Sequence, residues 1–146
     1  MNKNPAKPVF LGFKDIEVGR EALFTRTVTE QDIDRFAEIT GDYNPLHFDD
    51  DYARREQFDG RILPGLLTAS FISRLIGMLL PGKQALYLSQ EIKFVKPVYT
   101  GDTLLIKGTV LEKIPGKKNK IVLQTEIKNQ HDAVVLAGSA RILIRS

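Results

Sequence analysis

With 146 residues, the chain has the length of a single domain, large enough to bury about two thirds of the surface that its unfolded form would expose. It contains no cysteine, which excludes disulfide bridges, thiolate metal sites and a cysteine nucleophile, and is compatible with a cytoplasmic location. The net charge of +3 is small, and the 21 basic residues are scattered rather than gathered on one predicted helix. This distribution argues against nucleic-acid binding.

The first residues, 1–8, are polar, contain two prolines and lack the apolar core of a signal peptide. We therefore expect no export and a short disordered lead-in. The lead-in is expected to extend to residue 14, and residues 15–146 to form a single domain, because no internal repeat divides them.

A strand and a helix are predicted next. Residues 20–28 are rich in Thr, Val and Phe, which indicates a strand. Thr29 is placed to cap the helix that follows, and Asp32, three residues on, forms an approximate capping box with it. Gly41 is expected to end this helix, whose apolar side chains repeat at helical spacing.

The most informative segment is Gly-Asp-Tyr-Asn-Pro-Leu-His-Phe-Asp, residues 41–49. Pro45 lacks an amide hydrogen and disfavours helical geometry in Asn44, so Asp42 and His47 are expected on a shaped loop rather than on a regular helix. Such a loop can bring the carboxylate and the imidazole toward one point, where they could hold a water molecule. Taken singly, each is more often a structural residue, but the joint motif favours a pair that performs acid/base chemistry.

A short helical turn is expected at 51–55, and a second long helix between Pro64 and Pro81. The long helix is apolar nearly all round apart from Arg74, which indicates an element enclosed by other structure. Its 16 residues fall short of the roughly 20 that are required to span a membrane. It is therefore predicted to be a buried central helix.

From residue 85 onward, apolar residues alternate with polar ones, which predicts four strands. Short segments rich in turn-forming residues separate them, so neighbouring strands are expected to pair antiparallel. With the first strand they are expected to form an antiparallel sheet that curls around the apolar helix, an α+β arrangement. The four predicted strands are 86–94, 104–110, 121–127 and 134–144.

The order of these elements, the Gly-Asp-x-Asn-Pro-Leu-His-x-Asp motif and a buried helix that opens at Gly65 together resemble the MaoC-type hot-dog family, in particular the (R)-specific enoyl-CoA hydratases. The resemblance covers about residues 15–145. It implies a hot-dog fold, in which one antiparallel sheet wraps around a central helix. It also implies the site residues: Asp42 and His47 as the catalytic pair, Asn44 as a supporting residue, the backbone N–H of Gly65 as the group that polarises the thioester carbonyl, and Ser73 as the residue that orients the aspartate.

One position departs from the pattern of the family. Many members have a histidine immediately before the glycine, where this chain has Pro64, so any role of that histidine in the pocket is absent. Proline suits the first turn of a helix, where its missing amide hydrogen costs nothing, so the Gly65 amide remains available. We expect this amide to face the developing oxyanion at the positive end of the helix dipole.

The resemblance implies reversible hydration of trans-2-enoyl-CoA, or of an acyl-carrier thioester, to the (R)-3-hydroxyacyl thioester, with no metal and no cofactor. The stereochemistry follows from the resemblance alone. Hydration requires a base for the attacking water, an acid that protonates C2 and a group that stabilises the enolate oxygen, and Asp42, His47 and Gly65 can supply these parts. A sheet wrapped on one helix leaves edges and an apolar flank exposed, so a homodimer is expected, with the acyl tunnel near the interface.

Two other functions remain open. A hot-dog thioesterase would hydrolyse the same ligands, but it usually uses a carboxylate from the central helix, and this chain has no Asp or Glu between Gly65 and Leu80. A non-catalytic acyl-CoA-binding regulator could use the same pocket, but it would normally need a DNA-binding extension, and about 15 residues precede the predicted domain.

Overall fold

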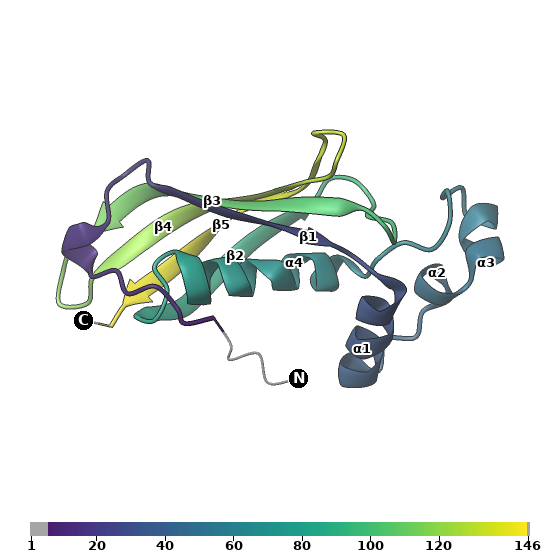
Figure 1. The fold of residues 1–146 in the computed structure, drawn as a ribbon, viewed down its shortest axis with the longest axis horizontal. Helices are drawn as coiled ribbons and strands as arrows, with labels where there is room; N and C mark the ends of the chain where they lie inside the picture. Colours follow the sequence, from purple (N-terminus) through teal and green to yellow (C-terminus); the bar gives the residue numbers. More distant parts are fainter. Residues whose placement is uncertain (1–5, 146) are drawn as a thin grey trace.

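Five antiparallel strands form one sheet in the computed structural model, which describes residues 6–145 (Figure 1). The strands are β1 (Glu21–Thr27), β2 (Ala85–Phe94), β3 (Thr103–Ile114), β4 (Lys120–Lys128) and β5 (Val134–Ile144). Their order in the sheet is β1-β3-β4-β5-β2, so β1 and β2 are the two edges. The predicted strands and the α+β hot-dog arrangement are confirmed.

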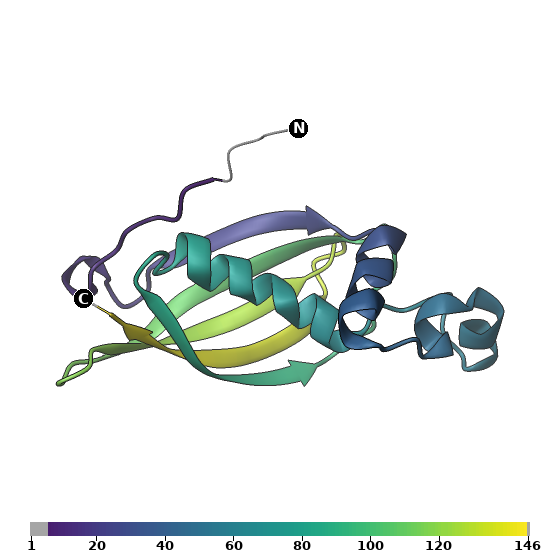
Figure 2. The same ribbon diagram turned by 90° about the horizontal axis from the view of Figure 1, so that it is seen from below.

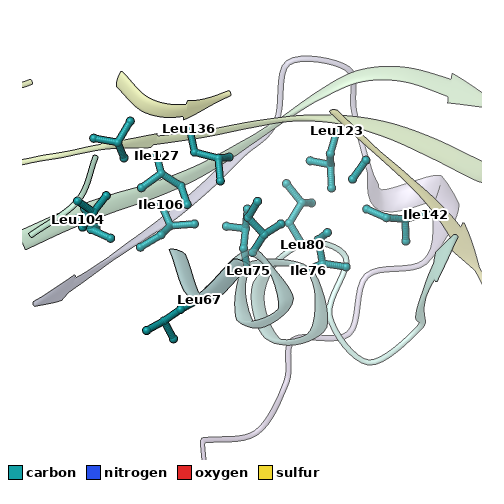
Figure 3. Packing of buried hydrophobic residues seen from close by; sticks show 14 of the residues in the cluster. Leu67, Leu75, Ile76, Leu80, Leu104, Ile106, Leu123, Ile127, Leu136 and Ile142 are labelled. Atoms are coloured by element: carbon teal, nitrogen blue, oxygen red, sulfur yellow. The ribbon is translucent and has the colours of Figure 1, made fainter. Parts of the chain in front are cut away.

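Helix α4 (Gly65–Arg74) lies against the inner face of the sheet and continues into a π-helical segment, η2 (Leu75–Leu79) (Figures 1 and 2). Leu75 packs in one buried cluster with sheet residues such as Leu123 and Ile127 (Figure 3). Burying one such side chain stabilises the fold by about 1.5–3 kcal/mol. The predicted central helix is thus confirmed, but it is buried on one face only, because Leu66, Ser70, Ser73 and Arg74 are exposed on the other. Its end has the wider π pattern of hydrogen bonds. Within residues 6–145, no helix is long and apolar enough to cross a membrane.

Helix α1 (Glu30–Thr40) begins and ends where the sequence predicts. The Asp32 amide donates to Thr29 Oγ1 at 3.2 Å, and the Thr29 amide donates to Asp32 Oδ2 at 2.9 Å, which closes the capping box. Gly41 ends the helix with a left-handed backbone at φ 78°. Asp32 also pairs with Arg26 of β1 at 2.5 Å, which ties α1 to the sheet. Burial favours a higher pKa for Asp32, but the hydrogen bonds from Thr29 and the Arg26 charge outweigh it and lower the pKa below its usual 3.8.

Two short helices follow, α2 (Pro45–Phe48) and α3 (Asp50–Arg55), and they lie with α1 at one end of the sheet (Figure 2). The predicted helical turn is confirmed as α3, but the expectation of a loop is wrong for His47, which lies in α2. The proline is the first residue of α2, where its missing amide hydrogen is not needed, and the Asn44 side chain caps the helix by accepting a backbone hydrogen bond at 3.0 Å. Asn44 itself keeps the non-helical backbone expected before proline, with φ −54° and ψ 132°.

The segment before the sheet contacts the end of the central helix. The Val9 amide donates to the Met78 carbonyl at 3.0 Å, and the Lys83 amide donates to the Val9 carbonyl at 2.8 Å. A 3-10 turn, η1 (Phe13–Asp15), comes between this contact and β1. The prediction of disorder for residues 1–8 concerns mostly residues 1–5. These lie outside the described residues, as does residue 146.

Candidate active site

A pocket of about 500 Å³ lies where α1 and α2 meet the start of α4 and the end of β2. Asp42 and His47 form part of its wall, beside Gly65 at the start of α4. Most of the remaining wall is apolar and includes Phe36, Phe58, Leu66, Phe94, Val98 and Val135. A few polar groups in an otherwise apolar cavity are typical of a site for a small molecule.

Asp42 and His47, predicted as a pair, are brought together in this wall. Nε2 of His47 lies 3.8 Å from Oδ2 of Asp42, which is too far for a direct hydrogen bond but lets one water oxygen lie within hydrogen-bond distance of both. The His47 side chain is 12% exposed and that of Asp42 is 42% exposed. The Asn44 amide donates to Oδ1 of Asp42 at 3.1 Å, and the Asp42 amide donates to Thr40 Oγ1 at 3.2 Å. The bond from Asn44 to Oδ1 orients the carboxylate so that Oδ2 faces His47, and the bond to Thr40 fixes the backbone of Asp42.

The backbone of Ile62 holds the imidazole of His47 from the other side. Nδ1 of His47 lies 2.8 Å from the Ile62 carbonyl oxygen. A carbonyl oxygen only accepts, so Nδ1 carries a hydrogen, and in the neutral form of the ring the Nε2 lone pair is directed toward Asp42. The Ile62 amide donates to the Leu46 carbonyl at 3.1 Å, so a second bond joins the same two segments.

Arg61 is a residue of this site that the sequence did not predict. Its Nε donates to the His47 backbone carbonyl at 2.6 Å, and its guanidinium carbon lies 5.4 Å from the centre of the Phe48 ring. The Arg61 side chain is 14% exposed and lies behind His47 rather than in the pocket wall. No local pattern signals this contact, because Arg61 follows His47 by 14 residues and meets it only where the chain folds back before α4.

Gly65 is the first residue of α4 and Pro64 is its N-cap, one position earlier than the expected place of the proline inside the first turn. Leu67 and Thr68 donate to the Pro64 carbonyl, whereas the Gly65 amide has no acceptor among residues 6–145. A Cβ atom at Gly65 would lie 2.9 Å from the Phe94 ring, so a larger residue at this position would displace that half-exposed ring. The predicted free amide therefore borders the pocket.

Two predicted supporting residues lie outside the pocket wall. Asn44 caps α2 and bonds to Asp42 through its backbone amide. Ser73 is an exposed residue of α4, about two turns beyond Gly65, and within residues 6–145 no hydrogen bond joins it to Asp42. The role of Ser73 therefore stays a prediction.

The arrangement combines two groups that can accept hydrogen bonds from one water molecule with a backbone amide at a helix N-terminus. Such a site is suited to proton transfer beside a developing negative charge. In the described part of the chain, no group of three or more His, Cys, Asp or Glu side chains is placed to hold a metal ion.

Comparison with known proteins places this geometry in a family. Residues 14–132 match the family described as MaoC like domain. The chain is 40% identical to a 3-hydroxybutyryl-CoA dehydratase of Methylorubrum extorquens, over 92% of this chain and 84% of the relative, and 39% identical to an (R)-specific enoyl-CoA hydratase of Rhodospirillum rubrum, over 90% of each. Among solved structures, the unliganded R-hydratase PhaJ1 of Pseudomonas aeruginosa is similar with a TM-score of 0.85 and 39% identity, over 91% of this chain and 84% of that one. The chain therefore belongs to the family of proteins with a MaoC-like domain.

Proposed function

We propose that this protein catalyses the reversible hydration of trans-2-enoyl-CoA to (R)-3-hydroxyacyl-CoA, with Asp42 and His47 acting on one water molecule. The observation that carries the proposal is the separation of 3.8 Å between Oδ2 of Asp42 and Nε2 of His47 in the pocket wall. The names of the similar proteins, an (R)-specific enoyl-CoA hydratase and a 3-hydroxybutyryl-CoA dehydratase, support the same reaction in its two directions.

In the proposed mechanism, the water donates one hydrogen bond to Oδ2 of Asp42 and the other to Nε2 of His47. Both partners accept, so an oxygen lone pair of the water is left to attack C3 of the enoyl thioester. Asp42 takes a proton from the water as the bond between oxygen and C3 forms. The same proton then passes from Asp42 to C2, which completes the addition of water across the double bond.

The Gly65 amide is proposed to stabilise the enolate oxygen that forms between these two steps. This amide lies at the N-terminus of α4, where the helix dipole is positive, and it borders the pocket. A donor that is fixed before the reaction needs no reorganisation when negative charge develops on the thioester oxygen. Because the glycine has no side chain, the thioester can approach the backbone closely.

A thioesterase and a non-catalytic acyl-CoA-binding protein are the alternatives. Helix α4 carries no carboxylate, which leaves a thioesterase without the residue that hot-dog thioesterases usually use. A binding protein has no need for an aspartate and a histidine that are held at the distance of a shared water. Hydration therefore explains both the Asp42–His47 pair and the lack of a carboxylate on α4, and neither alternative explains both.

We further propose that the protein acts as a homodimer in the cytoplasm. β2 is an edge of the sheet, and such an edge offers unpaired backbone groups to a second copy. Large apolar side chains are also exposed along it: Leu86, Tyr87, Leu88, Phe94 and, just beyond the strand, Val95. Phe94 also lines the pocket, so a partner at this edge would border the acyl site. The cytoplasmic location is supported by the absence of cysteine.

The reaction class can be tested with purified protein and a series of trans-2-enoyl-CoA thioesters from crotonyl-CoA upward. Hydration removes the absorbance of the conjugated thioester without releasing a thiol, whereas hydrolysis releases free CoA. We expect loss of absorbance, no thiol and an (R)-3-hydroxyacyl product. Inactivity on every chain length, or thiol release at a matching rate, would reject the proposed hydration. Acyl-carrier thioesters in the same assay would determine the preferred carrier.

A further inference from the structure

We propose that Arg61 is a positioning residue for His47, which holds the imidazole at the distance from Asp42 that the shared water requires. The inference rests on the proposed function and adds to it a residue that touches neither the pocket nor the substrate. Arg61 acts through the backbone of His47, to which its Nε donates a hydrogen bond of 2.6 Å.

Three hydrogen bonds join the chain before α4 to α2. The Ile62 amide donates to the Leu46 carbonyl at 3.1 Å, and Nδ1 of His47 donates to the Ile62 carbonyl at 2.8 Å. Arg61 adds the third point on the His47 carbonyl, so the backbone and the side chain of His47 are bound by two consecutive residues. α2 has only four residues, and so short a helix does not hold its shape without tertiary contacts.

The Arg61 side chain is largely buried, and its main polar contact is the hydrogen bond to the His47 carbonyl. It is 14% exposed, and its Nη1 lies 3.6 Å from Oε1 of Glu30 at the start of α1. Glu30 is 69% exposed, so this ion pair contributes little by itself, whereas the hydrogen bond to the His47 carbonyl is partly buried. Lysine cannot replace arginine here, because the Nε–H of arginine points sideways from the chain while the guanidinium plane remains free to stack.

The same guanidinium also supports the other end of the motif. It stacks at 5.4 Å on the ring of Phe48, and the Phe48 ring lies 5.5 Å from that of Tyr43. Tyr43 follows Asp42 directly and Phe48 follows His47 directly. Arg61 therefore contacts the backbone of one member of the pair and is linked through two rings to the neighbour of the other. Its loss is expected to change the distance between Nε2 and Oδ2 rather than the composition of the pocket.

The test compares Arg61→Gln and Arg61→Lys with two control variants. Glu30→Gln removes the ion pair but leaves the bond to His47, and Arg54→Gln removes an arginine of α3 that is 59% exposed and lies 3.8 Å from Asp51. We expect both Arg61 variants to lower kcat by about 10- to 100-fold with little change in KM, because a small displacement of a catalytic group has this effect on the chemical step. Both controls are expected to keep nearly full kcat.

A second measurement distinguishes positioning from general stability. The chain has two histidines, His47 and His131, so the ¹⁵N signals of the imidazoles can be assigned with a His131→Asn variant. In the wild type we expect the neutral His47 ring to carry its hydrogen on Nδ1, and in the Arg61 variants we expect a mixture of tautomers. A purely structural role would lower the melting temperature without this change in the His47 signals.

Each outcome decides the matter. Equal kcat and unchanged His47 signals in a folded Arg61→Gln variant would overturn the inference, and so would an equal loss of kcat in Glu30→Gln. If Arg61→Gln does not fold, the kcat and the His47 signals of Arg61→Lys decide instead. If neither variant folds, Arg61 is required for folding, and the proposed positioning role is overturned. If the wild type hydrates no enoyl-CoA, the proposed function fails, while the ¹⁵N signals still test the effect of Arg61 on His47.

Discussion

Nδ1 of His47 lies 2.8 Å from the carbonyl oxygen of Ile62, so the backbone of one residue determines which imidazole nitrogen faces the pocket. Because Nδ1–H donates a hydrogen bond to this carbonyl, Nε2 of the neutral ring is an acceptor, 3.8 Å from the Asp42 carboxylate. In the proposed mechanism, Asp42 then acts as the base, and His47 accepts a hydrogen bond from the same water molecule.

Asp42→Asn keeps the size of the side chain but removes the proposed base, so kcat is expected to fall by about 10²–10⁴-fold while the fold survives. His47→Gln is expected to act similarly. Because both residues are proposed to bind the same water, the double variant should lose much less than the product of the two single losses. Steady-state kinetics with crotonyl-CoA, with circular dichroism as the control for folding, measures this. Losses that simply multiply would contradict a shared water.

A second prediction concerns the start of α4. Gly65→Val should lower kcat/KM by at least about 100-fold, because the new side chain meets the Phe94 ring and the approaching thioester. Pro64→His should leave most of the activity, since proline contributes no hydrogen-bond donor at this position. In a Phe94→Ala background, the Cβ atom of Gly65→Ala no longer meets the Phe94 ring, so the fold should tolerate it. The kcat/KM should stay low, because the new methyl group still hinders the approach of the thioester. Comparable losses in Pro64→His and Gly65→Val would mean that Pro64 has a direct role.

A third prediction links Asp32 to the pH dependence of stability. Asp32→Asn should lower the free energy of unfolding at pH 7 by about 1–2 kcal/mol, because it weakens the cap of α1 and removes the charge pair with Arg26. The folded-state pKa of Asp32 is lowered, so its contribution is fully present above the usual 3.8 and is lost as the pH falls through the folded-state pKa. Urea unfolding at about pH 7 and about pH 3 should therefore show a difference that shrinks in acid. Asp34→Asn, at an exposed position of the same helix, is the control and should show no such trend.

A fourth prediction concerns assembly. Light scattering should give a mass of about 33 kDa, twice the 16.4 kDa of one chain, as expected for a closed two-fold interface. Charges placed on the β2 edge in the double variant Leu86→Glu/Leu88→Glu should shift the protein toward monomers, since both leucines are exposed there. Leu23→Glu makes the same kind of change on β1, the other edge, and should leave the mass unchanged. A wild-type monomer at assay concentration would contradict the proposed dimer.

The sequence by itself determined the elements whose causes are local. Thr29, Asp32 and Gly41 bound α1 through hydrogen bonds and a backbone angle that involve neighbours in the chain, and the alternation in β4 buries Ile121, Leu123 and Ile127 on one face. Hydrogen bonds over three or four residues and a side-chain period of two can be followed in a single sequence. The proximity of Asp42 and His47 is also local in origin, because they are five positions apart and the proline between them restricts the backbone to few conformations.

Tertiary structure alone decided how that pair is held. Arg61 and Ile62 reach His47 from 14 and 15 residues away, and Phe94 reaches Gly65 from another strand. His47 also lies in a one-turn helix rather than a loop, because contacts from the segment before α4 stabilise a helix that its own four residues could not maintain. Such contacts depend on the path of the whole chain, and no periodicity or local spacing encodes that path. The sequence therefore indicated the groups that we propose to be catalytic, and the fold determined their orientation and support.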